Sequence, residues 1–155
     1  MIRAAAADAG ALAPYAALVA PPARAGERTM WDPLMPPVAG LKLQFHTNWV
    51  EPGDCTLSRV ERHPYAAQAF LPLDVGRYLV TVFPAAPDGG PERRAAKSFV
   101  VPGNRGVIYR QGIWHAGISV LDDPGSFAVL MWRGAPDDDQ FADIAPLMID
   151  IPSSR

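Results

Sequence analysis

The 155 residues carry a formal net charge of −2, are 49% hydrophobic and 19% charged, and include one cysteine. This composition is typical of a globular chain with one domain, and a single cysteine excludes an intramolecular disulfide and a cysteine-based zinc cluster. The sequence has neither a concentrated basic face nor a run of about 18 apolar residues. We therefore expect no nucleic-acid partner, no membrane span and a cytoplasmic location.

We expect one domain over residues 1–155, with an N-terminal arm (1–40), a barrel core (41–135) and a C-terminal segment (136–155). Asp8 is a suitable N-cap for a short helix that Pro14 limits. The proline-rich and glycine-containing residues 20–40 predict an irregular stretch. Its apolar side chains would be costly to expose, so we expect them to pack on the barrel or on a second subunit; they are Met30, Trp31, Leu34 and Met35.

From residue 41 the pattern changes to short strands separated by turn residues. The predicted strands span residues 41–46, 56–61, 68–73, 77–83, 98–101, 106–109, 113–121 and 126–132. Short strands with turn signals every 8 to 12 residues are typical of an all-β sandwich or barrel, and no helical period competes with them. We predict a mainly all-β, jelly-roll β-barrel with an interior for a small ligand, closed by a C-terminal helix or strand.

Histidine occurs at positions 46, 63 and 115, and two of these positions stand in informative surroundings. In Glu61-Arg62-His63-Pro64, strand geometry places Glu61 and His63 on one face and Arg62 on the other, and proline ends the strand. The alternative is a solvated charge run in which Arg62 forms a structural ion pair. The spacing matches neither a His-x-His pair nor a His-Glu-x-x-His helix.

The second stretch covers residues 104–115, where alternation around a glycine predicts a tight bend between two strands. Tyr109, Arg110 and His115 lie near this bend. The alternative is that Trp114 is a core residue, Tyr109 a rim aromatic and Arg110 merely exposed.

Together the two stretches resemble the signatures of the ureidoglycolate lyase family, E-R-H-P…Q-A-F-x-P-L and G-V-x-Y-x-x-G-V-W-H. The matching residues are Glu61-Arg62-His63-Pro64, Gln68-Ala69-Phe70, Pro72-Leu73, Gly106-Val107, Tyr109 and Gly112-Ile113-Trp114-His115. The resemblance implies a cupin-like β-barrel, usually a homodimer, that cleaves ureidoglycolate to glyoxylate and urea. The wider match extends over most of the chain.

The chain departs from the family pattern at four places. Family members usually have histidine at Arg110, His-Pro at Ala116-Gly117, arginine at Lys97 and an acidic residue before Arg133. These departures indicate a divergent member whose substrate is open. The alternatives are another enzyme on the same barrel that acts on a small carboxylic acid, or a binding protein without catalysis.

For the lyase reaction we expect His115, His63 and Glu61 to act as acid and base, without assigning which is which. Arg62, Lys97 and Arg110 are the candidates for binding the substrate carboxylate. Gln68 and Tyr109 are the candidates for hydrogen bonds to the ureido group. Glu61, His63 and His115 offer an open three-ligand site for a divalent metal, but the sequence does not establish a cofactor.

Overall fold

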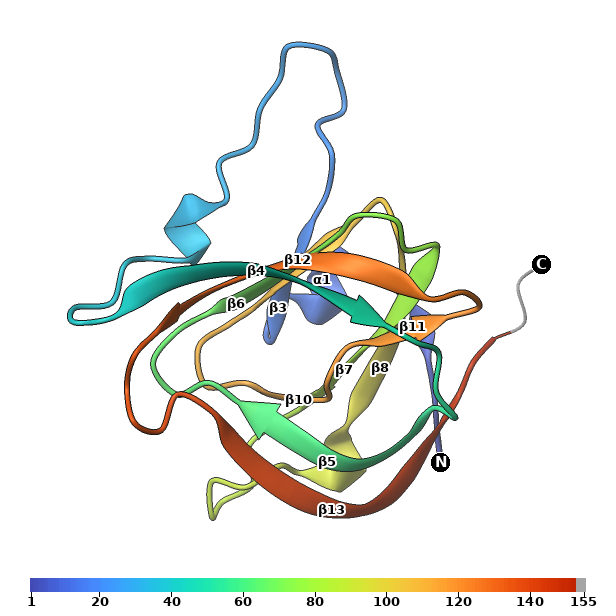
Figure 1. The fold of residues 1–155 in the computed structure, drawn as a ribbon. Coiled ribbons are helices and arrows are strands. Elements are labelled where there is room, and N and C mark those ends of the chain that lie inside the picture. Colours follow the sequence, from blue (N-terminus) through green and yellow to red (C-terminus); the bar gives the residue numbers. More distant parts are fainter. Residues whose placement is uncertain (153–155) are drawn as a thin grey trace.

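The computed structural model describes residues 1–152, and most of their regular structure is strand (Figure 1). The helical elements are short: α1 (Ala9–Leu12) and the 3₁₀ helices η1 (Asp32–Leu34) and η2 (Arg93–Ala95). The strands are β1 (Ile2–Arg3), β2 (Ala5–Ala6), β3 (Ala16–Val19), β4 (Lys42–Val50), β5 (Thr56–Arg62), β6 (Gln68–Pro72), β7 (Arg77–Phe83), β8 (Lys97–Pro102), β9 (Gly106–Tyr109), β10 (Trp114–His115), β11 (Ser119–Leu121), β12 (Gly125–Arg133) and β13 (Gln140–Asp150). The prediction of a mainly all-β fold is confirmed.

The strands form two sheets that face each other across the core (Figure 1). The eight-stranded sheet has the order β1-β13-β5-β10-β7-β8-β2, with β11 also paired to β7. The five-stranded sheet has the order β3-β9-β6-β12-β4. From β4 to β7 each successive strand lies in the opposite sheet, as in a jelly roll, whereas β7 and β8 are paired neighbours in the larger sheet.

The N-terminal residues close the larger sheet. β1 pairs in parallel with β13 at one end of the strand order, and β2 pairs in parallel with β8 at the other. Residues 2–6 therefore join the two ends of this sheet into a nearly closed barrel. The expected arm thus contributes strands to both sheets, because β3 also pairs with β9. Asp8 caps α1 as expected, since its side chain accepts a hydrogen bond from the backbone N–H of Ala11.

The central strand β7 separates two apolar cores. Tyr78, Val80 and Val82 belong to the core between the sheets. Leu79 and Phe83, which point the opposite way along the strand, belong to a second core inside the closed sheet. Burial on both faces explains why β7 reads as a nearly continuous apolar run. We use the term inter-sheet face for the side of the larger sheet that carries Val82.

The predicted strand 113–121 is two strands in the structure. His115 of β10 lies opposite Val82, whereas Ser119 of β11 lies opposite Leu79. The chain advances four residues from His115 to Ser119 while β7 advances three, from Val82 to Leu79. The extra residue makes the chain bulge over residues 116–118. The C-terminal segment takes the strand form of the two predicted alternatives: β13 pairs along β5.

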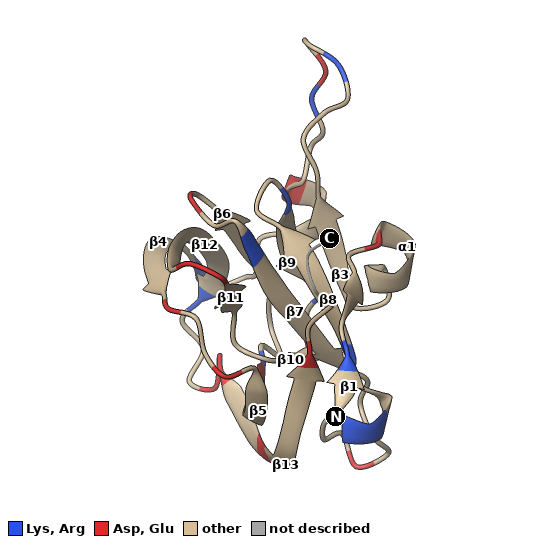
Figure 2. Ribbon diagram, turned by 90° about the vertical axis from the view of Figure 1, so that its right-hand side faces the viewer, with Lys and Arg blue, Asp and Glu red and all other residues tan. Residues whose placement is uncertain are grey.

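Residues 20–40 are irregular apart from η1, as expected. Trp31, Leu34 and Met35 pack against the outer side of the five-stranded sheet, whereas Met30 is 65% exposed. No helix within residues 1–152 is long and apolar enough to cross a bilayer. Basic and acidic positions are interspersed along the ribbon (Figure 2).

Candidate active site

The site forms where β5, β10 and β7 lie side by side. Glu61 of β5 is the direct partner of His115 of β10, and His115 is the direct partner of Val82. Directly opposed residues of antiparallel strands project from the same face. Because Val82 points into the core between the sheets, Glu61 and His115 point there too. His115 is 1% exposed, so its ring nitrogens are shielded from water.

His115 presents an unpartnered nitrogen to a carboxylate. Its Nδ1 lies 3.0 Å from the carbonyl oxygen of Ile113, which only accepts, so Nδ1 carries a proton. Its Nε2 lies 3.4 Å from Oε1 of Glu61, is buried and makes no hydrogen bond of good geometry. In a neutral His115 two acceptors would therefore face each other. A proton or a cation between them removes this repulsion.

The ionisation of Glu61 reflects the same pair. Burial raises its pKa, but the close contact and charge of His115, with the charge of His63, outweigh that effect and lower it. Glu61 is therefore a carboxylate at neutral pH. A carboxylate next to a buried imidazole is an arrangement that can both take and give a proton.

Tyr109 covers the other side of the His115 ring. The two rings are stacked, with centroids 4.0 Å apart and planes 13° apart. The hydroxyl of Tyr109 is buried and has no hydrogen-bond partner within residues 1–152. Burial raises the Tyr109 pKa well above its ordinary value, so the hydroxyl keeps its proton and is a donor without an acceptor.

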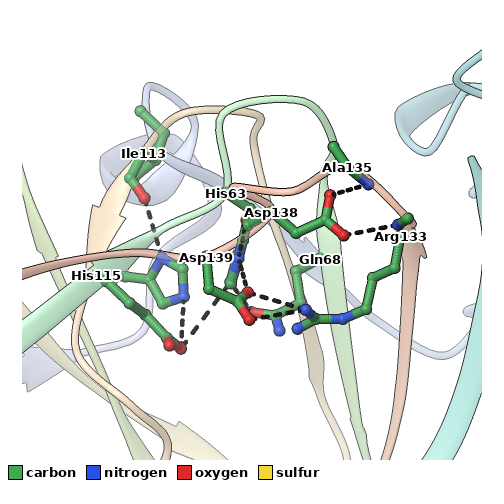
Figure 3. Close-up of polar contacts among 10 residues, drawn as sticks. His63, Gln68, Ile113, His115, Arg133, Ala135, Asp138 and Asp139 are labelled. Atoms are coloured by element: carbon green, nitrogen blue, oxygen red, sulfur yellow. Dashed lines mark hydrogen bonds and ion pairs between the residues drawn. The ribbon is translucent and has the colours of Figure 1, made fainter.

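His63 lies beside this pair, with its ring centroid 5.2 Å from that of His115 (Figure 3). Its Nε2 is 2.9 Å from Oε1 of Gln68 and 3.9 Å from Oε1 of Glu61. Its Nδ1 is 2.9 Å from a carboxylate oxygen of Asp139. Burial, and then the nearby charge of His115, lower the pKa of His63 although the two carboxylates oppose the shift. Both ring nitrogens face acceptors, and a neutral ring carries one N–H, so it donates either from Nδ1 to Asp139 or from Nε2 to Gln68.

Asp139 and Arg133 support His63, although neither residue was predicted from the sequence to lie in the site. Nη1 of Arg133 lies 3.0 and 2.9 Å from the two carboxylate oxygens of Asp139, which in turn contacts His63 (Figure 3). Burial raises the pKa of Asp139, but the hydrogen bonds and charge of Arg133 outweigh it and lower the pKa. The acidic run 137–139 was the one available signal, and nothing in it tells which carboxylate reaches the barrel.

The residues predicted to bind the substrate do not all lie in the site. Gln68 and Tyr109 lie in the site. Arg62 points to the opposite face, where it donates to Gln140 and to the carbonyl of Gly89 and lies 4.6 Å above the Trp114 ring. This is the separation of faces that the strand period predicted.

Arg110 and Lys97 are both exposed. Arg110 donates to the carbonyl of Ala13, away from Glu61 and His115. Lys97 is the direct partner of Val82 and so shares the inter-sheet face with His115, but its Nζ lies 5.5 Å from the Tyr15 ring centroid. The structure therefore brings together Glu61, His63, His115, Gln68 and Tyr109, and leaves the three predicted cations outside this group.

The donor set fits a divalent metal. Glu61, His63 and His115 each offer one ligand atom, and the three atoms lie within 4.8 Å of one another. The Nε2 atom of His115 lacks a partner, and its tautomer is fixed by the carbonyl behind it, as is usual for a metal-ligating histidine. Two imidazoles and one carboxylate suit zinc, manganese or iron and leave positions open.

Comparison with known proteins assigns the chain to a family. The family described as "Ureidoglycolate lyase" matches residues 35–150. The ureidoglycolate lyase of Schizosaccharomyces pombe is 36% identical over 54% of this chain and 46% of its own length. That of Pseudomonas syringae pv. syringae is 33% identical over 64% and 59%, and that of Burkholderia cepacia 39% over 52% and 44%.

The chain thus spans about half the length of the curated relatives that it matches. Among solved structures, one titled as RmlC from Streptococcus suis in complex with dTDP-D-xylose has a TM-score of 0.46 and 17% identity, over 62% of this chain and 46% of that one. The family match covers both sequence motifs and every residue that the structure gathers around His115. The chain belongs to the ureidoglycolate lyase family.

Proposed function

We propose that this chain cleaves ureidoglycolate to glyoxylate and urea, with Glu61 and His115 as the acid–base pair. The observation that carries the proposal is the buried contact between the Glu61 carboxylate and Nε2 of His115, where no other group satisfies the histidine nitrogen. A single proton shared by a carboxylate and an imidazole supplies one base and one acid in the same place.

The reaction needs one general base and one general acid. Glu61 accepts the proton of the substrate hydroxyl while that oxygen forms the aldehyde carbonyl of glyoxylate and the carbon–nitrogen bond breaks. His115 donates a proton from Nε2 to the departing urea nitrogen. The proton on Glu61 then returns to His115 across the 3.4 Å that separates them, so the enzyme ends as it began.

The remaining side chains position the substrate and the pair. The Tyr109 hydroxyl, buried and without an acceptor, donates to an oxygen of the substrate. Gln68 and Asp139 hold His63, whose ring lies against that of His115 and keeps water away from it.

A divalent metal is a compatible occupant of the same residues. Glu61, His63 and His115 would hold it, and as a Lewis acid it would favour ionisation of the substrate hydroxyl. With a metal bound, Glu61 and His115 would act as its ligands rather than as the acid–base pair.

The test is release of glyoxylate from racemic ureidoglycolate, corrected for the unaided decay of the compound. We compare the wild-type chain with Glu61→Gln, His115→Ala and the control His46→Ala, whose side chain is exposed on β4. Each assay is run with EDTA and with added zinc or manganese. We expect Glu61→Gln and His115→Ala to lower kcat by about 10² to 10⁴-fold, and His46→Ala to match wild type.

Folded wild-type protein that releases no glyoxylate under any metal condition would contradict the lyase proposal. Turnover that persists in both Glu61→Gln and His115→Ala would show that other residues act as the general acid and base. Activity that is lost in EDTA and restored by one metal would identify the cation as the occupant of the pair.

We also propose that the chain forms a homodimer through β4. This nine-residue strand ends the five-stranded sheet, and within residues 1–152 its outer edge has no partner strand. Phe45 and Trp49 of β4 are 68% and 63% exposed. A long unpaired edge with exposed aromatic side chains favours pairing with a second copy. The cytoplasmic location stays a prediction.

The oligomeric state tests this second proposal. We expect light scattering after size exclusion to give a dimer for wild type and a monomer for Phe45→Glu. The control Met148→Glu, which places the same charge on another exposed apolar residue, should remain a dimer. A monomeric wild type, or a dimer that Phe45→Glu leaves intact, would contradict pairing through β4.

A further inference from the structure

We infer that Arg59 binds the carboxylate of the substrate, in a cavity that opens beside Glu61. The inference rests on the proposed function for the identity of the substrate. The chain has a recognition site for small carboxylates, and the cation of that site is Arg59 rather than Arg62, Lys97 or Arg110.

Strand geometry places Arg59 beside the reacting pair. Arg59 and Glu61 are two residues apart on β5, so both project from the inter-sheet face. Across on β13, Phe141 lies opposite Glu61, and Asp143 lies opposite Arg59. The side chains of Arg59, Glu61 and Phe141 therefore line one edge of the space between the sheets. Arg62 has the same charge on the same strand but points the other way.

A cavity of about 220 Å³ occupies this position. It is lined by Arg59, Val60, Glu61, Gly117 and Phe141. Its walls thus carry one cation, one carboxylate of the proposed acid–base pair and an aromatic face. Gly117 adds no side chain, and a Cβ built there would meet nothing within 4 Å, so the β10–β11 bulge leaves the cavity open.

The guanidinium of Arg59 is positioned but has no anionic partner. Its central carbon lies 4.3 Å from the centroid of the Phe141 ring, a cation–π contact that orients the planar group. Within residues 1–152 its nitrogen atoms make no hydrogen bond and no ion pair within 4.0 Å, including to Asp143. A guanidinium held by an aromatic ring with its N–H groups free suits two-pronged binding of a carboxylate.

The other cations are less suited to this task. Arg62 is engaged by Gln140 and Gly89, and Arg110 by Ala13. Lys97 shares the inter-sheet face, but Val82 separates it from His115, and Glu61 lies one strand further. Arg59 alone among these four lines the cavity that Glu61 lines.

Two measurements test the inference on the full chain. The first is calorimetric titration with glyoxylate and with its neutral counterpart glyoxylamide. The second is the kcat and KM of glyoxylate release from ureidoglycolate. The variants are Arg59→Ala, Arg59→Lys and Asp143→Asn. The control is Arg94→Ala, which removes the same charge from an exposed position on η2.

We expect wild type to bind glyoxylate at least tenfold more tightly than glyoxylamide, and Arg59→Ala to abolish this preference. Arg59→Ala should raise KM at least tenfold with a smaller change in kcat, and Arg59→Lys should recover part of the loss because a lysine keeps the charge but not the two-pronged contact. Arg94→Ala and Asp143→Asn should match wild type, and all variants should keep the wild-type Tm.

The outcomes separate this inference from the proposed function. Wild-type turnover with KM within twofold of wild type in Arg59→Ala would overturn the inference and leave the lyase reaction standing. Arg59-dependent glyoxylate binding in a chain that does not turn over ureidoglycolate would contradict the proposed lyase reaction and support the carboxylate site. A lowered Tm together with a raised KM in both Arg59→Ala and Asp143→Asn would make Arg59 a structural partner of Asp143 and overturn the inference.

Discussion

At the scale of single residues, the site is a set of polar groups that burial leaves incompletely paired. His115 has a fixed tautomer on one side and an unpartnered nitrogen on the other. Tyr109 stacks on that ring and buries a hydroxyl without an acceptor. Unpaired buried polar groups cost free energy, and a folded protein usually keeps few of them. Their concentration around one imidazole indicates that a ligand completes the pairing.

This predicts that Tyr109→Phe makes the protein more stable and less active. The substitution removes a buried hydroxyl that has no partner, and such a group costs roughly 1–3 kcal/mol. It keeps the ring that stacks on His115. We expect a higher free energy of unfolding in urea and glyoxylate release reduced by about tenfold, the loss of roughly one hydrogen bond. Reduced stability together with full activity would contradict a substrate role for this hydroxyl.

At the scale of elements, the close approach of two turns fixes how β6, β7, β8 and β9 meet. The backbone N–H of Gly103, in the β8–β9 turn, donates to the carbonyl of Gly76 in the β6–β7 turn at 2.8 Å. A Cβ at Gly103 would lie 1.6 Å from the carbonyl oxygen of Val75. The two backbones are in contact, and neither can give way as a flexible side chain can.

Gly103→Ala should therefore be strongly destabilising. We expect a loss of about 2 kcal/mol or more, seen as a fall in Tm of roughly 4–8 °C. The matched control is Gly53→Ala in the β4–β5 turn, where a Cβ meets nothing within 4 Å, and its effect should stay within about 0.5 kcal/mol. Equal Tm values for the two variants would show that the turns separate at little cost.

At the scale of the whole molecule, the buried ionisable groups tie the stability of the fold to pH. His63 is 3% exposed and its pKa is lowered by burial and by His115. Glu61 and Asp139 both have lowered pKa values, although burial opposes their ionisation. All three groups favour the fold in their deprotonated forms. Lowering the pH should therefore reduce the free energy of unfolding in two stages, first as the His63 imidazole is protonated and then as the carboxylates of Glu61 and Asp139 are protonated.

The first stage can be measured separately. Below the pKa of about 6.5 for an unfolded histidine, the unfolded chain binds a proton that the folded chain does not, so stability falls as pH drops through this value toward the lower folded pKa. We expect Tm to fall between pH 7.5 and 5.5 in wild type and to fall less in His63→Gln. His46→Gln, an exposed control on β4, should follow wild type. A pH dependence that His63→Gln leaves unchanged would assign the effect to other groups.

The sequence by itself determined most of the barrel strands and the faces of their residues, but not β1 to β3 or the division of residues 113–121 into β10 and β11. A period of two fixes which side chains share a face, so Glu61 and His63 were separated from Arg62 before any strand was paired. The motif around Gly112 likewise placed Tyr109 and His115 near one bend. These features are local, because they depend on the backbone period and on turn residues within a few positions.

Only the tertiary structure decided which faces meet. The register that sets Glu61 opposite His115, the reach of Asp139 to His63 and the cavity at Arg59 all depend on pairings between segments far apart in the chain. A shift of one residue would turn each of these side chains to the other face. Local sequence cannot fix such a register, since it is selected by the burial of both cores at once.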